Sequence, residues 1–120
     1  MLQIKRIYDA PAKTDGYRIL VDQLWPRGIS KEHAHLDKWA KEITPSSELR
    51  TEFHNGQYTF PGFSHAYIVE LSNNPSMEQF IAEIRNRLAH GNVTLLYAAH
   101  DATANHAIVL KNYIDKKLQI

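Results

Sequence analysis

The residues best suited to chemistry follow an apolar run early in the chain. Asp22, Trp25 and Arg27 come just after residues 19–21, which form an expected buried strand. The tryptophan offers a flat apolar face to a base or a sugar, and the guanidinium offers a fork that matches a carboxylate or a phosphate. Side chains that follow a strand end in an α/β protein are well placed to contact ligands. This group therefore predicts the start of a ligand site.

A second polar group follows the apolar run 93–98, far along the chain. It places Asp101, Asn105 and His106 around the expected start of the last helix. Unpaired N–H groups at a helix start favour an anion, and an aspartate and a histidine can exchange protons near neutral pH. The predicted catalytic residues are Asp101 and His106, and the predicted ligand-binding residues are Asp22, Trp25, Arg27 and Asn105.

Each of these residues also has a purely structural interpretation. Trp25 could fill the core beneath the sheet edge. Arg27 could pair with Asp22 or Glu42 to fix the turn. Asp101 could cap the following helix, and Asn105 could tie down the preceding loop. The sequence leaves both interpretations open.

Three apolar segments predict the strands that position these groups. They span residues 2–8, 17–22 and 93–98. The loop 9–16 is too short for a helical crossover, so we expect the first two strands to pair antiparallel. The long stretch between the second and third strands allows a right-handed crossover, so we expect these two strands to run parallel. Their C-terminal ends would then open onto one edge of the sheet.

The segment between the second and third strands, together with the C-terminal segment, has the apolar spacing of helices. One apolar face runs from Leu36 through Trp39 and Ala40 to Ile43, and further helices are expected at 45–53, 63–71, 75–88 and after Asp101 or Thr103. The long run 93–98 is apolar on both faces, which is typical of a central strand covered on both sides. The fold class predicted is α/β, with a small mixed sheet of about three strands covered by about five helices.

The composition limits what kind of protein this chain can be. It has 120 residues, no cysteine and a formal net charge of +1. The length predicts a single domain over residues 1–120. The lack of cysteine excludes disulfides, thiolate metal sites and a cysteine nucleophile. The small net charge argues against a dedicated nucleic-acid binder, and no helix-turn-helix pattern is present.

Targeting and metal patterns are also missing from the sequence. There is no 18-residue apolar run and no signal-peptide pattern at the start, so we expect a cytoplasmic protein without a membrane segment. His33 and His35 would point to nearly opposite sides of a helix, so we expect no metal ion there. No sequence pattern indicates a cofactor.

Several stretches carry a family resemblance that covers nearly the whole chain. Residues 15–22, the block Leu-Trp-Pro-Arg-Gly at 24–28 and the block at 93–99 resemble the short members of the domain of unknown function 488 family. Longer relatives imply a parallel, Rossmann-like sheet, a helix between the first two strands and a cysteine after the last strand. This chain lacks that helix and that cysteine, so the resemblance implies no thiol chemistry. Gln23 and His100 also stand where the family pattern has cations.

Two functional hypotheses follow. The first is that a phosphate-bearing or nucleotide-like ligand binds at the C-terminal edge of the strands, with Asp101 as a possible acid or base. The alternative is a non-catalytic protein-interaction domain in which Trp25 and Arg27 are the contact residues. A concave pocket lined by Arg27 would favour the first hypothesis, and a flat apolar patch around Trp25 would favour the second.

Overall fold

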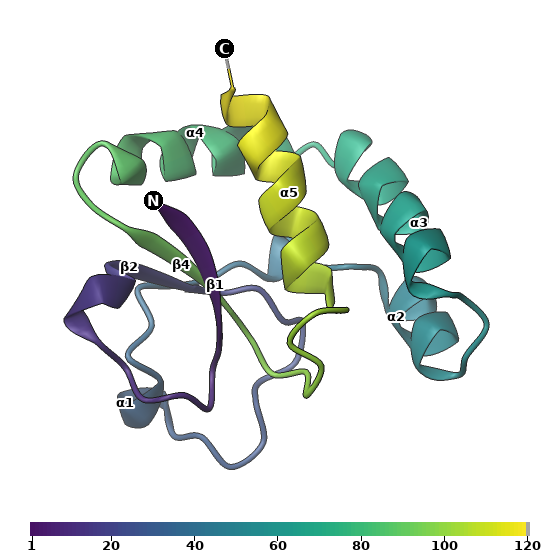
Figure 1. Ribbon diagram of the computed structural model, residues 1–120, viewed down its shortest axis with the longest axis horizontal. Coiled ribbons are helices and arrows are strands. Elements are labelled where there is room, and N and C mark those ends of the chain that lie inside the picture. Colours follow the sequence, from purple (N-terminus) through teal and green to yellow (C-terminus); the bar gives the residue numbers. More distant parts are fainter. Residues whose placement is uncertain (120) are drawn as a thin grey trace.

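The computed structural model describes residues 1–119 and contains one parallel sheet with helices on both faces (Figure 1). The strands are β1 (Leu2–Arg6), β2 (Tyr17–Leu20), β3 (Lys38–Trp39) and β4 (Val93–Tyr97), in the order β1-β4-β2-β3. All three neighbouring pairs are parallel. The α/β class is confirmed, with four strands instead of about three and a sheet that is parallel throughout instead of mixed.

β4 is the central strand that the sequence predicted. All five of its residues are buried, and it pairs with β1 on one side and with β2 on the other. Leu95 faces the larger core, whereas Leu96 faces a smaller core on the opposite side of the sheet. The predicted parallel arrangement with residues 19–21 is therefore confirmed, as is the common edge formed by the strand ends.

The predicted antiparallel pairing of the first two strands is wrong. β1 and β2 each pair with β4 and not with each other. The connection 7–16 can extend to about 33 Å at ~3.3 Å per residue, which exceeds the ~17 Å return along a five-residue strand and the ~10 Å step across β4. A short 3-10 turn, η1 (Lys13–Asp15), is therefore sufficient and no helix is needed.

Gly16 is required where this connection passes under the start of β4. Its φ is 64°, and a Cβ at this position would lie 2.0 Å from the carbonyl oxygen of Asn92. The amide of Tyr17 then donates to that same oxygen, which sets the register between β2 and β4. A larger residue would push the two strands apart.

Five helices complete the fold, as predicted in number. They are α1 (Lys31–Ala34), α2 (Ser47–His54), α3 (Phe60–Ser72), α4 (Met77–Leu88) and α5 (His106–Leu118), with a 3-10 turn η2 (Lys41–Ile43) before α2. Figure 1 shows α3, α4 and α5 on one side of the sheet and α1 on the other. Within residues 1–119, no helix has both the length and the apolar character that a bilayer crossing requires.

The predicted helical face from Leu36 to Ile43 is wrong. α1 ends at Ala34, His35 follows it as the C-cap with a left-handed φ of 50°, and the chain then runs along the edge of β2. The carboxylate of Asp37 accepts from the amide of Arg18 at 2.8 Å, and this contact guides the chain into β3. Pairing with the free edge of β2 thus makes residues 38–39 a strand, although the apolar residues around them have the spacing of a helix.

Candidate functional site

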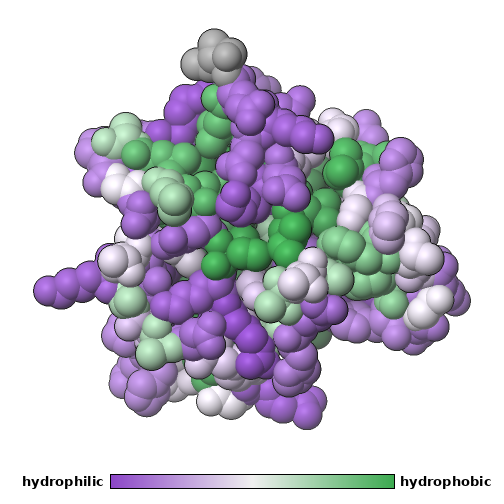
Figure 2. All heavy atoms as spheres, in the orientation of Figure 1, coloured by the Kyte–Doolittle hydropathy of each residue, from purple (hydrophilic) through white to green (hydrophobic). Residues whose placement is uncertain are grey.

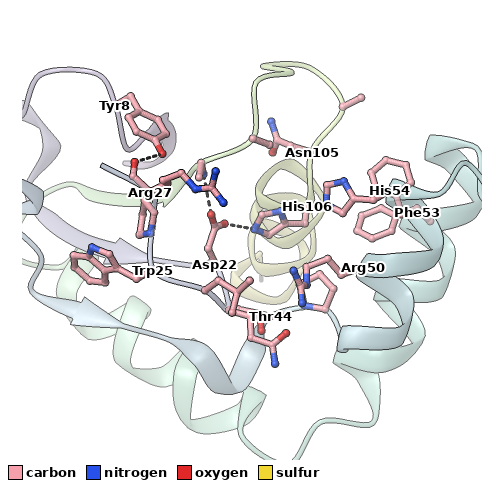
Figure 3. A pocket seen from close by; sticks show the side chains of 18 residues that line it. Tyr8, Asp22, Trp25, Arg27, Thr44, Arg50, Phe53, His54, Asn105 and His106 are labelled. Atoms are coloured by element: carbon pink, nitrogen blue, oxygen red, sulfur yellow. Dashed lines mark hydrogen bonds and ion pairs between the residues drawn. The ribbon is translucent and has the colours of Figure 1, made fainter. Parts of the chain in front are cut away.

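A cavity of about 360 Å³ lies at the C-terminal edge of the sheet (Figure 3). It is lined by the segments that follow β1, β2 and β4, by the residues just before α2, and by residues of α2, α3 and the start of α5. Five of the six predicted site residues line it: Asp22, Trp25, Arg27, Asn105 and His106. Because β2 and β4 run parallel, segments far apart in the sequence meet at this edge.

Asp22 and His106 form the polar floor of the cavity. The amide of Ala98 donates to Oδ2 of Asp22 at 3.0 Å, so this carboxylate ties the ends of β2 and β4 together. Nε2 of His106 lies 2.9 Å from the carbonyl oxygen of Val21 and 2.8 Å from Oδ1 of Asp22. Since both neighbours are acceptors, Nε2 carries a hydrogen, which it donates to the carbonyl oxygen of Val21. Within residues 1–119, Oδ1 of Asp22 is buried and has the ion-pair contact with His106 but no hydrogen bond.

Asp101 lies outside the cavity, in contrast to the other predicted residues. Its Oδ1 accepts from the amides of Thr103 and Ala104 and from the Thr103 hydroxyl. These hydrogen bonds, led by the one from the Thr103 amide, lower the pKa of the exposed Asp101 carboxyl. Proton transfer between Asp101 and His106 therefore stays a prediction, and this geometry does not favour it. The carboxylate beside His106 is that of Asp22.

The predicted cap of the last helix by Asp101 or Thr103 is wrong. α5 begins later, at His106, and its N-cap is Asn105, whose Oδ1 accepts from the amide of Ile108 at 3.0 Å. Nδ2 of Asn105 donates to the backbone oxygen of Asp101 at 2.8 Å. Both ends of this carboxamide are engaged within the protein, so Asn105 shapes the cavity by holding the loop.

Trp25 combines the two roles that the sequence left open. Its Nε1 donates to the carbonyl oxygen of Ile29 at 2.6 Å, and its ring meets Trp39 edge-on with centroids 5.2 Å apart. The ring packs against the smaller core, which includes Leu20 and Leu96. Trp25 is therefore a half-buried wall of the cavity, fixed from behind.

Arg27 lies exposed at the rim, held there through its backbone. The hydroxyl of Tyr8 donates to its carbonyl oxygen at 2.8 Å. The predicted alternative, in which its guanidinium pairs with Asp22 or Glu42, is not observed: within residues 1–119 this guanidinium has no ion pair and no hydrogen bond. Figure 3 shows its side chain directed over the cavity.

Arg50 is the functional candidate that the sequence reasoning missed. It lies on α2, lines the same cavity and is half-buried. In the part of the chain that the structure describes, its Nε is buried without a hydrogen-bond partner. The available signal was the spacing on the expected helix 45–53, because Arg50 and Phe53 stand three residues apart and share a face.

Among the described residues that line the cavity, none supplies a thiol or a hydroxyl free to act as a nucleophile. The chain has no cysteine. The only hydroxyls among the described lining residues belong to Tyr8 and Thr44, and both donate to backbone carbonyl oxygens, of Arg27 and Lys41 respectively. Residues 1–119 also contain no group of three His, Asp or Glu side chains that could hold a metal ion.

Comparison with known proteins agrees with the family resemblance of the sequence blocks. The family described as the inactive DUF488-N3 subclade matches residues 1–120. The chain belongs to this DUF488 family. The uncharacterised protein YeaO of Escherichia coli (strain K12) is 45% identical over 94% of this chain and 96% of its own length. An uncharacterised protein of Mycobacterium bovis is 32% identical over 95% of this chain and 93% of its own length. No solved structure matches the chain significantly.

Proposed function

We propose that this DUF488 protein binds a small phosphate-bearing, nucleotide-like ligand in the cavity, without forming a covalent bond to it. The supporting observation is that Arg27 and Arg50 both line the cavity and that neither guanidinium has a carboxylate partner among residues 1–119. The Nε of Arg50 is buried without a partner, which is destabilising, whereas the exposed Arg27 keeps its contact with water. An anion between the two arginines would remove that penalty through charge-assisted hydrogen bonds.

The start of α5 adds to the preference for an anion. The amide of Ile108 is satisfied by the N-cap Asn105, whereas the amides of His106 and Ala107 have no acceptor within the helix. Such amides carry the positive end of the helix dipole. The cavity therefore combines two guanidiniums with the start of α5, which lines it through Asn105 and His106.

The lining favours binding over catalysis. A histidine paired with a carboxylate can act as a general base only when a nucleophile or a water lies within its reach. The Tyr8 and Thr44 hydroxyls are both engaged with carbonyl oxygens, and the family description names an inactive subclade. We therefore assign to Asp22 and His106 the role of a polar floor that orients the ligand.

The protein-interaction hypothesis rests on a different observation. At the rim, Leu24 is 61% exposed and Tyr8 is 42% exposed, which makes them available to a partner. Trp25, however, uses its indole N–H and one ring edge within the protein, so it is a poor contact hot spot. This function is retained as the alternative if no anion binds.

Calorimetric titration with inorganic phosphate tests the proposal. The wild-type protein should bind it, and Arg27→Ala and Arg50→Gln should each weaken binding by about 1.5 to 3 kcal/mol, the range for a hydrogen bond to a charged group. Arg85→Ala is the matched control, because Arg85 is exposed on α4, away from the cavity. A wild-type protein that binds no phosphate, or an equal loss in Arg85→Ala, would contradict the proposal.

A further inference from the structure

The cavity combines a cation and an aromatic ring on a single helix face. Arg50, Phe53 and His54 occupy positions i, i+3 and i+4 of α2, and all three line the cavity. Side chains at this spacing have Cβ atoms about 5–6 Å apart. Figure 3 shows the three side chains on the cavity side of α2. An anionic group bound by Arg50 would therefore lie only a short linker away from the ring of Phe53.

The ring of Phe53 is fixed in place from behind. It stacks on Phe63 with centroids 4.3 Å apart and planes inclined by 20°, and Phe60 continues this aromatic cluster at 6.3 Å from both. Phe53 and Phe63 line the cavity, whereas Phe60 does not. Figure 2 shows that hydrophobic atoms also reach the surface beside α5 on the side facing α3. A rigid aromatic wall of this kind suits a planar group better than a flexible chain.

The size of the cavity limits the ligand further. At about 360 Å³ it lies near the lower end of the range of ~300–1,000 Å³ for small-molecule sites. The chain also lacks a glycine-rich loop that could wrap a pyrophosphate. Both observations favour one phosphoryl group and one ring over a dinucleotide.

Building on the proposed function, we infer that the ligand is a phosphate monoester with a planar ring. Its phosphate lies between Arg27 and Arg50, and its ring lies against Phe53. The apolar wall and the unpaired guanidiniums are both needed, because neither one alone selects such a molecule over free phosphate or over a neutral aromatic compound. Phenyl phosphate and a pyrimidine mononucleotide share this chemistry.

Titration with four probes tests the inference: inorganic phosphate, ribose 5-phosphate, phenyl phosphate and uridine 5′-monophosphate. The two ring-bearing esters should bind about tenfold more tightly than the other two, which is the gain that one aromatic stack can supply. Phe53→Leu should remove most of this gain and leave the affinity for inorganic phosphate unchanged. Phe60→Leu is the matched control, because it alters the same aromatic cluster behind the cavity wall. Circular dichroism melts verify that both variants fold.

The outcomes separate this inference from the proposed function. If inorganic phosphate binds and all four probes have equal affinity, the ring inference fails while the proposed function stands. If no probe binds to the wild-type protein, the proposed function fails and the inference fails with it. An equal loss of ring selectivity in Phe60→Leu, or no loss in Phe53→Leu, would overturn the assignment to Phe53.

Discussion

The protein uses arginine in two opposite ways, once inside strand β2 and once around the cavity at the C-terminal edge of the sheet. Arg18, in β2, is 4% exposed and pairs with Asp15, which is 3% exposed. Its other nitrogens donate to the carbonyl oxygens of His35 and Ala34 at 3.0 and 2.9 Å. These contacts join β2 to η1 and α1. Each of the three nitrogens of this guanidinium therefore has a partner inside the protein.

At the C-terminal edge the guanidiniums of Arg27 and Arg50 have no such partners within residues 1–119. The same residue type therefore has different roles in the two regions. An arginine whose donors are satisfied by its own chain holds the fold, whereas one that lines a cavity with free donors is available to an outside anion. Substitution of Arg18 should therefore lower the stability of the fold, whereas substitution of Arg27 or Arg50 should weaken anion binding.

The largest expected effect is on stability, in the paired region. Arg18→Met should lower the free energy of unfolding by about 3 to 5 kcal/mol, because it leaves the Asp15 carboxylate buried with only Lys5 as a cation. Arg50→Met should leave it unchanged or raise it slightly, because the substitution breaks no hydrogen bond within residues 1–119 and removes a buried Nε that lacks a partner. Urea unfolding of both variants measures this difference. Equal costs in the two variants would contradict the distinction between them.

The packing around the paired region gives the next largest effect. Leu96 is fully buried in the smaller core, together with Ala34, whose carbonyl oxygen binds Arg18. Leu96→Ala should cost about 2 to 5 kcal/mol through lost burial and a residual cavity. A loss below about 1 kcal/mol in the same urea assay would show that ion pairing, not packing, dominates on this face.

A smaller effect should appear in the dependence of stability on pH. Burial alone would raise the pKa of Asp15, but hydrogen bonds from Ala12, Lys5 and Arg18 outweigh it, so the pKa is lowered in the folded protein. Its ionisation therefore stabilises the fold above the unfolded pKa of about 3.9, and this contribution is lost as pH falls through the lower folded value. Urea unfolding between pH 5 and pH 2.5 should show a steeper loss in wild type than in Asp15→Asn. Parallel curves would rule out this contribution.

The smallest expected effect is at Asp101. Its carboxylate accepts hydrogen bonds only within its own loop and does not line the cavity. Asp101→Asn should slightly lower the melting temperature and leave phosphate affinity unchanged. A clear loss of affinity without a change in melting would instead support the ligand-site role predicted from the sequence.

The sequence predicted those parts of the fold that depend on local pattern. An uninterrupted apolar run identified the central strand β4, and apolar stripes identified α3 and α4. β1 and β2 do not pair with each other, because β4 lies between them. The length of the loop between β1 and β2 could not reveal this arrangement. The two-residue strand β3 depends on the contact between Asp37 and Arg18, which only the folded chain provides.

The candidate site was predictable to a similar extent. Parallel strands bring their C-terminal ends together, so the gathering of Asp22, Arg27 and His106 around one cavity followed from topology. The pairing of His106 with Asp22 was not predicted, because α5 begins two residues later than a cap at Thr103 would place it. Arg50 was missed because its helix was interpreted through its apolar face alone.

NMR titration of ¹⁵N-labelled protein with inorganic phosphate compares the two kinds of arginine in one experiment. The Nε–H signals of Arg27 and Arg50 and the amide signals of His106 and Ala107 should shift and saturate together. The Nε–H signal of Arg18 should remain unchanged, because it already donates to His35. An absence of saturable shifts, or shifts that are largest at Arg18 or at the C-terminal Lys116 and Lys117, would contradict an anion site at the sheet edge.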